Sequence, residues 1–272
     1  MSSAREFGWE PLVGDYVLEH DGYLAGSDDH RLADLNRVSS DESIDAIWCI
    51  RGGYGALRLL HGIDYDAWRR RPKTLIGYSD ITALHSAIGP RADLVTFHGP
   101  TARGTLTDFS RASFRAALIE REQPCGVAPE GVTLRGGRAR GRLVGGNLAL
   151  LASLCGTPYA PRYDGGILVV EDVNESVYRI DRMFTQLELA GVLGKIKGFV
   201  FGACSECGPG DGNYGALTLE EIFKDHILPL GVPAWQGAMI GHAQPQWTLP
   251  EGARVEIDAT AATIRLLEAP VG

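Results

Sequence analysis

The stretch KTLIGYSDITALHSAI, residues 73–88, decides how the rest of the chain is interpreted. Residues 74–76 form an apolar run long enough for a buried strand, and from Ile81 onward apolar residues recur at helical spacing. The turn between these two segments carries Ser79. A serine at such a corner can point its hydroxyl into a cleft that the first free amides of the helix also face. Ser79 is therefore a candidate nucleophile with an oxyanion site beside it.

The same turn also has a simpler interpretation. Ser79 or Asp80 could merely cap the following helix, because serine and aspartate both favour that position. The familiar nucleophile turn of hydrolases has glycine two residues after the serine, where this chain has Ile81. The local motif therefore leaves capping and catalysis open.

Length and composition are those of an ordinary soluble protein. The chain has 272 residues, 44% hydrophobic and 22% charged, which allows one large domain or two modest ones. A net charge of −8 and a pI near 5.4 argue against nucleic acid or an anionic membrane as a main partner. The N-terminus has no apolar segment of signal-peptide type, and no run approaches a membrane span.

The five cysteines, at positions 49, 125, 155, 204 and 207, are odd in number and lack the spacing of a disulfide framework. This usage predicts reduced thiols and a cytoplasmic location. The pair Cys204 and Cys207 would need two further ligands to hold a structural zinc, and the sequence has no second CxxC and no HxxxH. We therefore expect no metal site.

Three strand–turn–helix units follow one another, with strands expected at 45–50, 74–76 and 94–98. Such units predict a mostly parallel sheet, in which ligands collect at the carboxyl ends of the strands. Gly53, Ser79 and His98 would all lie at that edge, which strengthens the case for Ser79.

The glycine cluster RGGYG, residues 51–55, follows the first of these strands. It lacks the spacing of a dinucleotide site and the lysine of a P-loop, so we expect no nucleotide cofactor. Adjacent glycines let backbone N–H groups approach an oxyanion closely, although they also suit an ordinary tight turn.

The remaining segments alternate between strands and helices. The segment 123–141 is rich in Gly, Pro and Arg and predicts a linker between an N-terminal domain, residues 1–122, and a C-terminal domain, residues 142–272. Ser27 is expected to cap a helix over 28–38. Other helices are expected at 4–7, 56–60, 109–122, 148–154, 179–190 and 219–227, and other strands at 10–13, 142–144, 166–173, 196–201, 233–240, 254–258 and 263–267.

A serine hydrolase needs a base for the hydroxyl proton and a carboxylate that orients the base. His98 and His242 each end an apolar strand beside glycine, where a side chain enters a cleft. Glu171 and Asp172 close an apolar strand, where a carboxylate is costly unless it is paired.

Two alternatives compete with that assignment. Glu171 could belong to a structural salt bridge with Arg179 or Arg182, and Asp80 with His98 could form a second acid–base pair. Composition and spacing leave both open.

Several motifs in order resemble one family. RGGYG, GYSDIT (77–82), GGNL (145–148), LVVEDVNE (168–175) followed by YRIDRM (178–183), and a late GH (241–242) are similar to the LD-carboxypeptidases, as is DGYLAGSDDHRLADLN (21–36). This serine-peptidase family includes muramoyltetrapeptide carboxypeptidase and the microcin C immunity peptidases. The resemblance runs from about Phe7 to the end of the chain.

The resemblance implies a catalytic triad. Ser79 would be the nucleophile, His242 the general base and Glu171 the carboxylate that orients it. The backbone amides of Asp80 and of the turn at Gly53 would form the oxyanion hole. Gly52, Asn147 and Arg179, which lie in the same motifs, are expected to contact the substrate.

The resemblance also implies an α/β fold, with an N-terminal Rossmann-like domain and a C-terminal β-rich domain that together supply the triad. Family members begin with a strand that this sequence lacks, so we expect the first strand of the sheet to be missing. The implied reaction removes D-alanine from a murein tetrapeptide, without cofactor, in a cytoplasmic homodimer. An immunity-type peptidase acting on peptidyl-nucleotides, or a non-catalytic binder of small ligands, is the alternative.

Overall fold

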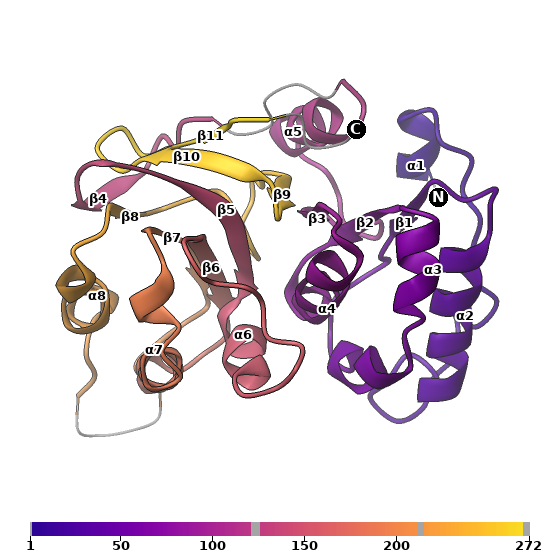
Figure 1. Ribbon diagram of the computed structural model, residues 1–272, viewed down its shortest axis with the longest axis horizontal. Coiled ribbons are helices and arrows are strands. Elements are labelled where there is room, and N and C mark those ends of the chain that lie inside the picture. The colour runs from indigo at the N-terminus through magenta and orange to yellow at the C-terminus, as the bar shows by residue number, and fades with distance from the viewer. Residues whose placement is uncertain (1, 121–125, 211–214, 269–272) are drawn as a thin grey trace.

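Two β-sheets, each with helices against it, make up the computed structural model, which describes residues 2–120, 126–210 and 215–268 (Figure 1). The smaller sheet has the order β1-β2-β3-β9. Its strands β1 (Ala46–Trp48), β2 (Thr74–Gly77) and β3 (Thr96–His98) are parallel, and β9 (Leu249–Glu251) pairs antiparallel with β3. The three strand–turn–helix units expected from the sequence therefore supply the three parallel strands of one sheet.

Helices cover both faces of this smaller sheet. The 3₁₀ turn Ser79–Ile81 runs directly into α4, which is buried along nearly its whole length. Ser27 caps its helix as expected, accepting the His30 amide at 3.2 Å. The helical segments of this half are α1 (Ser2–Glu6), α2 (Asp28–Ser40), the 3₁₀ helix Ala56–Gly62, α3 (Tyr65–Arg70), α4 (Thr82–Ala92) and α5 (Asp108–Leu118).

The larger sheet has seven strands in the order β11-β10-β5-β6-β7-β8-β4. Its long strand β5 (Arg138–Asn147) changes partners along its length, pairing antiparallel with β10 over residues 138–142 and parallel with β6 over 143–147. The other strands are β4 (Val132–Arg135), β6 (Ile167–Val173), β7 (Gly198–Ser205), β8 (Ala234–Gln236), β10 (Arg254–Asp258) and β11 (Thr263–Leu266).

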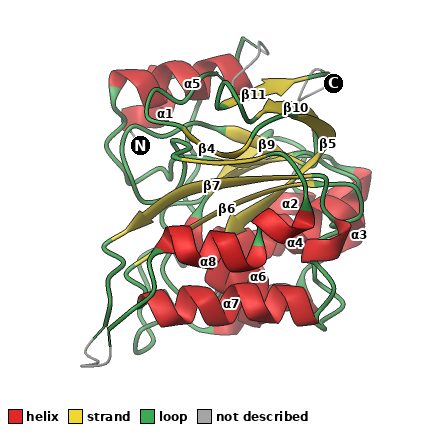
Figure 2. Ribbon diagram, turned by 90° about the vertical axis from the view of Figure 1, so that its left-hand side faces the viewer, coloured by secondary structure: helices red, strands yellow, loops and turns green. Residues whose placement is uncertain are grey.

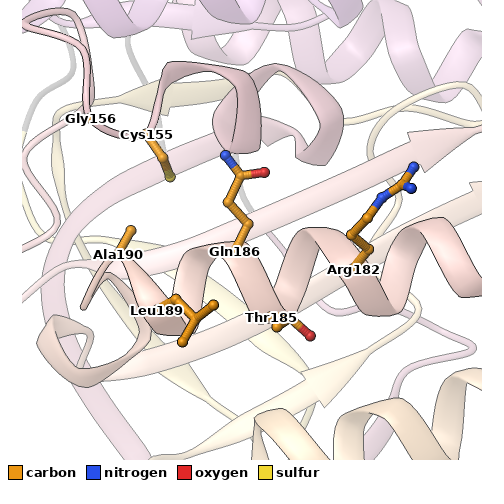
Figure 3. A pocket seen from close by; sticks show the side chains of 7 residues that line it. All are labelled: Cys155, Gly156, Arg182, Thr185, Gln186, Leu189 and Ala190. Carbon is orange, nitrogen blue, oxygen red and sulfur yellow. The ribbon is translucent and has the colours of Figure 1, made fainter.

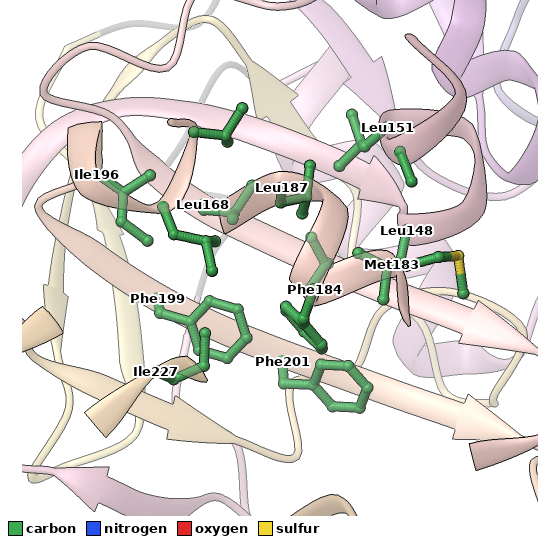
Figure 4. Close-up of a cluster of buried hydrophobic side chains, with 14 of the residues drawn as sticks. Leu148, Leu151, Leu168, Met183, Phe184, Leu187, Ile196, Phe199, Phe201 and Ile227 are labelled. Atoms are coloured by element: carbon green, nitrogen blue, oxygen red, sulfur yellow. The ribbon is translucent and has the colours of Figure 1, made fainter. Parts of the chain in front are cut away.

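Three helices cover one face of the larger sheet (Figure 2). They are α6 (Leu148–Leu154), α7 (Val177–Leu189) and α8 (Leu219–His226), with short 3₁₀ turns at Leu193–Lys195 and Leu228–Leu230. Figure 4 shows the apolar core between these helices and the sheet, in which Leu148, Phe184 and Phe199 are fully buried. Burial of such side chains is the main force that fixes helices on a sheet.

The two halves share structure. Strand β9 comes late in the sequence yet pairs with β3 of the N-terminal sheet. Leu154 of α6 packs into the same apolar cluster as Trp68 and Ile88 of the N-terminal half. These shared contacts hold the carboxyl ends of β2 and β6 near one another.

The expected α/β class with two sheet-based parts is confirmed. The strand expected over residues 10–13 is wrong, because this segment forms no ladder and runs as coil. Within the expected linker 123–141, residues 123–125 lie outside the described residues, while β4 and the start of β5 occupy 132–135 and 138–141. Those strands make the irregular connection shorter than expected, and the division into two domains stays a prediction.

The cysteines differ in part from the expectation of free thiols. Cys204 and Cys207 form a disulfide at the end of β7, whereas Cys49 and Cys155 are free, and Cys125 lies outside the described residues. In the described ranges, the helices are too short or too polar to cross a bilayer.

Candidate active site

Ser79 stands at the carboxyl end of β2 with φ = 66°, in the left-handed region that non-glycine residues seldom adopt. Such a conformation persists only where the surroundings hold it, and it is frequent at functional sites. Gly52 makes the close approach possible, because a Cβ there would lie 2.7 Å from Cβ and 3.0 Å from Oγ of Ser79. The serine is therefore held in a strained turn against the RGGYG segment.

His242 and Glu171 complete a hydrogen-bonded chain with this serine. Nε2 of His242 lies 3.0 Å from Oγ of Ser79, and Nδ1 lies 2.8 Å from Oε2 of Glu171. The Glu171 side chain is fully buried, whereas 21% of the His242 side chain is exposed. Because a carboxylate only accepts, the ring proton sits on Nδ1, and Nε2 is left free to accept the serine proton. This geometry suits nucleophilic catalysis.

The neighbours of His242 fix the position of its ring. Gly241 has φ = 89° and lies against Glu171, where a Cβ would come 2.6 Å from the carboxyl carbon. The Tyr78 ring meets the imidazole edge-on, with the ring centroids 5.0 Å apart. Gln246 donates from Nε2 to the Gly241 carbonyl at 2.9 Å. The glycine of the GH motif is thus required by the carboxylate packed on it.

Two carboxylates lie side by side at the end of β6. Nδ2 of Asn147 donates to Asp172 at 3.0 Å and more weakly to Glu171 at 3.4 Å. Asp172 also accepts the backbone amides of Ala149 and Val173. Burial, aided by the charge of Glu171, raises the pKa of Asp172 to about 6. Asp172 and Asn147 therefore form the polar support behind Glu171, which sequence reasoning did not assign.

Asn147 and Arg179 were expected to contact the substrate, and in the structure both contact neighbouring protein groups. Asn147 is buried, and its Oδ1 caps α6 by accepting the Leu150 amide at 3.2 Å. The Arg179 side chain is half exposed and contacts Glu175 and Tyr178 at the start of α7. Substrate contact by either residue stays a prediction.

The contacts contradict both alternatives that the sequence left open for the acid–base groups. The proposed salt bridge from Glu171 to an arginine is wrong, because its partner is His242. The pairing of Asp80 with His98 is also wrong: Asp80 accepts the Ala56 amide at 2.8 Å, and both ring nitrogens of His98 are buried without a partner. Burial lowers the pKa of His98 to about 3, so this ring is neutral.

The turn at Gly52 and Gly53 lies beside Ser79, where an oxyanion site was expected. Gly53 has φ = 106°, which favours glycine, and Gly52 contacts Ser79 directly. The Asp80 carboxylate ties this segment down through its bond to the Ala56 amide. The role of the Asp80 and Gly53 amides as oxyanion donors stays a prediction.

A second surface feature, a groove on the C-terminal half, lies apart from Ser79. A groove of about 460 Å³ lies between the end of α6 and α7 and contains no member of the Ser79 site (Figure 3). It is lined by Cys155, Gly156, Arg182, Thr185, Gln186, Leu189 and Ala190. In the described part of the chain no cluster of three or more His, Cys, Asp or Glu side chains could hold a metal ion.

Comparison with known proteins decides the family. Models of the N-terminal and C-terminal domains of LD-carboxypeptidases match residues 1–99 and 140–257. The chain belongs to the LD-carboxypeptidase family. Family and relatives make this LD-carboxypeptidase a serine-type hydrolase of peptide bonds.

Three known proteins illustrate what this LD-carboxypeptidase is similar to. The "Probable murein peptide carboxypeptidase" of Bacillus subtilis (strain 168) is 38% identical, over 98% of this chain and 85% of the relative. The structure of muramoyltetrapeptide carboxypeptidase from Oxalobacter formigenes is 30% identical with a TM-score of 0.83, over 97% and 91% of the two chains. That of microcin C7 self-immunity protein MccF with aspartyl sulfamoyl adenosine is 25% identical with a TM-score of 0.89, over 100% and 90%.

Proposed function

We propose that this LD-carboxypeptidase hydrolyses the amide bond between an L-centre and a C-terminal D-amino acid through the triad of Ser79, His242 and Glu171. D-alanine of a muramoyl tetrapeptide is the expected leaving residue, which places the reaction in peptidoglycan recycling. The continuous hydrogen-bonded chain from Oγ of Ser79 to Oε2 of Glu171 carries the proposal. Relatives named for murein peptides support the substrate class.

The mechanism follows from the protonation states that the contacts favour. As Oγ of Ser79 attacks the scissile carbonyl, Nε2 of His242 takes the hydroxyl proton, and Glu171 stabilises the resulting imidazolium. His242 then gives that proton to the leaving amine, and the acyl group remains on Ser79. A water molecule, deprotonated by the same ring, hydrolyses the ester and regenerates the serine.

Charge develops on the carbonyl oxygen in both steps. The strained turn of Ser79 presents the Asp80 amide at the start of a 3₁₀ helix, where backbone N–H groups lack internal partners. With an amide from the Gly53 turn, it would supply two donors to the oxyanion.

The decisive experiment measures release of D-alanine from muramoyl tetrapeptide by mass spectrometry. We expect Ser79→Ala to lower kcat by several orders of magnitude, roughly 10⁴- to 10⁶-fold, with little change in stability. Ser153→Ala, which removes an exposed serine hydroxyl on α6, is the matched control and should keep full activity. A fully active Ser79→Ala variant would rule out the assignment.

A second substrate class is favoured by the likeness to MccF, whose structure holds aspartyl sulfamoyl adenosine. The same triad could cleave a peptidyl-nucleotide of that kind. Assaying aspartyl sulfamoyl adenosine beside the tetrapeptide, with the same Ser79→Ala control, separates the two substrates by their kcat/KM. The assembled triad favours either hydrolase over a non-catalytic binder.

We also propose a cytoplasmic location and a homodimer, both supported by the family resemblance. Light scattering of the purified protein tests the second: a mass near twice 29.3 kDa is expected.

A further inference from the structure

Arg51 begins the RGGYG turn and is exposed beside the nucleophile. Its guanidinium folds back over the turn, with Nη1 3.4 Å from the Gly52 carbonyl oxygen. Gly53 makes room for it, because a Cβ at that position would collide with the guanidinium. On its other side the same turn contacts Ser79 through Gly52. A positive charge is therefore held at the rim of the nucleophile turn.

This charge has no anionic partner among the described residues. Nearby arginines differ in this respect, since Arg31 and Arg58 both pair with Asp28. Burial raises the pKa of the Asp80 carboxyl, and the charge of Arg51 acts in the opposite direction, but the two groups form no ion pair. The Arg51 guanidinium is thus free to bind an anion from solution.

A carboxypeptidase must distinguish a C-terminal residue from an internal one. The distinguishing group is the free α-carboxylate, carried by the carbon that also bears the leaving nitrogen. When the scissile carbonyl lies at Ser79, this carboxylate lies a few bonds away, at the rim of the site. A guanidinium is suited to it, because its planar fork donates two parallel hydrogen bonds to a carboxylate.

We propose that Arg51 binds the α-carboxylate of the C-terminal residue and thereby restricts the enzyme to chain ends. The inference rests on the proposed function and names the group that its substrate must present. It assigns to Arg51 a role in specificity, whereas the triad performs the bond cleavage.

Arg103 is the competing cation. Its backbone amide donates to the Ile50 carbonyl at 3.0 Å, so it too starts beside the end of β1. Its side chain instead lines a polar groove next to α1, with Glu6 and Arg111. Arg103 therefore provides a neighbouring control of the same charge and type.

The test compares two peptides, the tetrapeptide ending in D-alanine and the same peptide ending in D-alaninamide. Arg51→Gln should lower kcat/KM for the acid about 10- to 100-fold, as expected for losing a charged hydrogen bond, and should leave the amide unchanged. Arg51→Lys should give a kcat/KM for the acid between those of wild type and Arg51→Gln. Arg103→Gln should keep the acid-to-amide ratio of the wild type.

Labelling of Ser79 by a fluorophosphonate, which carries no carboxylate, should proceed equally in wild type and Arg51→Gln and shows that the triad is intact. An unchanged acid-to-amide ratio in Arg51→Gln, with active wild type, would overturn this inference alone. A loss of the acid-to-amide preference in Arg103→Gln, with the preference kept in Arg51→Gln, would also overturn the inference. Wild type that labels but cleaves neither peptide would overturn the proposed function together with the inference.

Discussion

The substitution Glu171→Gln separates the orientation of His242, the proposed base, from the packing of the site. The side chain is fully buried and accepts the Nδ1 proton of His242 at 2.8 Å, while Asn147 donates to its other oxygen at 3.4 Å. Glutamine has nearly the same shape, so the packing is retained. Its amide nitrogen can donate to Nδ1, however, which moves the ring proton to Nε2. That nitrogen can then no longer accept the proton of Ser79.

The magnitude follows from the role of the carboxylate. Loss of the orienting carboxylate in a triad costs about 10⁴-fold in kcat, equivalent to about 5.4 kcal/mol at 1.36 kcal/mol per factor of ten. Stability should change little. Glu171 helps to raise the pKa of Asp172, so a neutral glutamine removes repulsion between two buried carboxylates and offsets the weaker bond to His242.

The assay pairs the kcat for D-alanine release with the free energy of unfolding in denaturant at pH 7. We expect a loss of about 10⁴-fold in kcat with a stability change within about 1 kcal/mol. A kcat within about tenfold of wild type would refute the reasoning, because His242 would then be oriented without the carboxylate.

Two further substitutions test other features. Gly52→Ala should lower kcat/KM about 100-fold, because its Cβ would displace the turn from Ser79. Gly194→Ala, whose Cβ meets nothing within 4 Å, should leave kcat/KM unchanged, and similar losses in both variants would contradict the geometry. Glu251→Gln tests pH linkage. Burial, only partly offset by the Gly145 amide, raises the pKa of Glu251 from 4.5 to about 8, so the folded protein binds this proton more tightly than the unfolded chain. Relative to the variant, wild type should therefore keep its full stability below about pH 4.5 and lose up to about 5 kcal/mol as the pH rises through 8. Unfolding midpoints at about pH 4, 6 and 8 measure this loss, and a pH-independent difference would contradict it.

Elements with a strong local pattern could be predicted from the sequence. The helix expected over 148–154 is α6, because Asn147 caps its start and apolar residues repeat along it. The apolar run expected at 166–173 is β6, which is buried on both faces. The terminal hairpin also forms at the expected positions, as β10 and β11. In each case the information lies within one element or within two that adjoin in the sequence.

Elements that depend on distant partners could not be predicted. Leu12 and Val13 favour a strand over residues 10–13, but Pro11 cannot donate to a ladder, and the segment pairs with no strand of the described structure. Conversely, β9 contains Pro250, which argues against a central strand, yet it forms at the sheet edge because β3 is available there. The strand expected over 233–240 ends at Gln236, since Gly237 adopts φ = 90° and leaves the ladder.

The same dependence on distant partners governs the candidate site. Local patterns identified His242 by its place after an apolar run, but the loop that carries it is fixed by helix α5 of the N-terminal half. The amide of Gln246 donates to Ser110 and that of Thr248 to Ser113, each at 2.9 Å and across 136 and 135 residues. Nothing in the pattern of α5, an amphipathic helix, marks these two serines.

The loop between β8 and β9 is therefore anchored at one end to each sheet. It leaves the seven-stranded sheet after Gln236 and joins the four-stranded sheet at Leu249, with His242 between. Ser79 follows strand β2 of the smaller sheet, and Glu171 lies in β6 of the larger one. His242 thus contacts groups carried by both sheets, and a shift of one sheet against the other would stretch one of its two hydrogen bonds. This requirement gives the shared strand β9 a direct consequence for catalysis, since it limits such shifts.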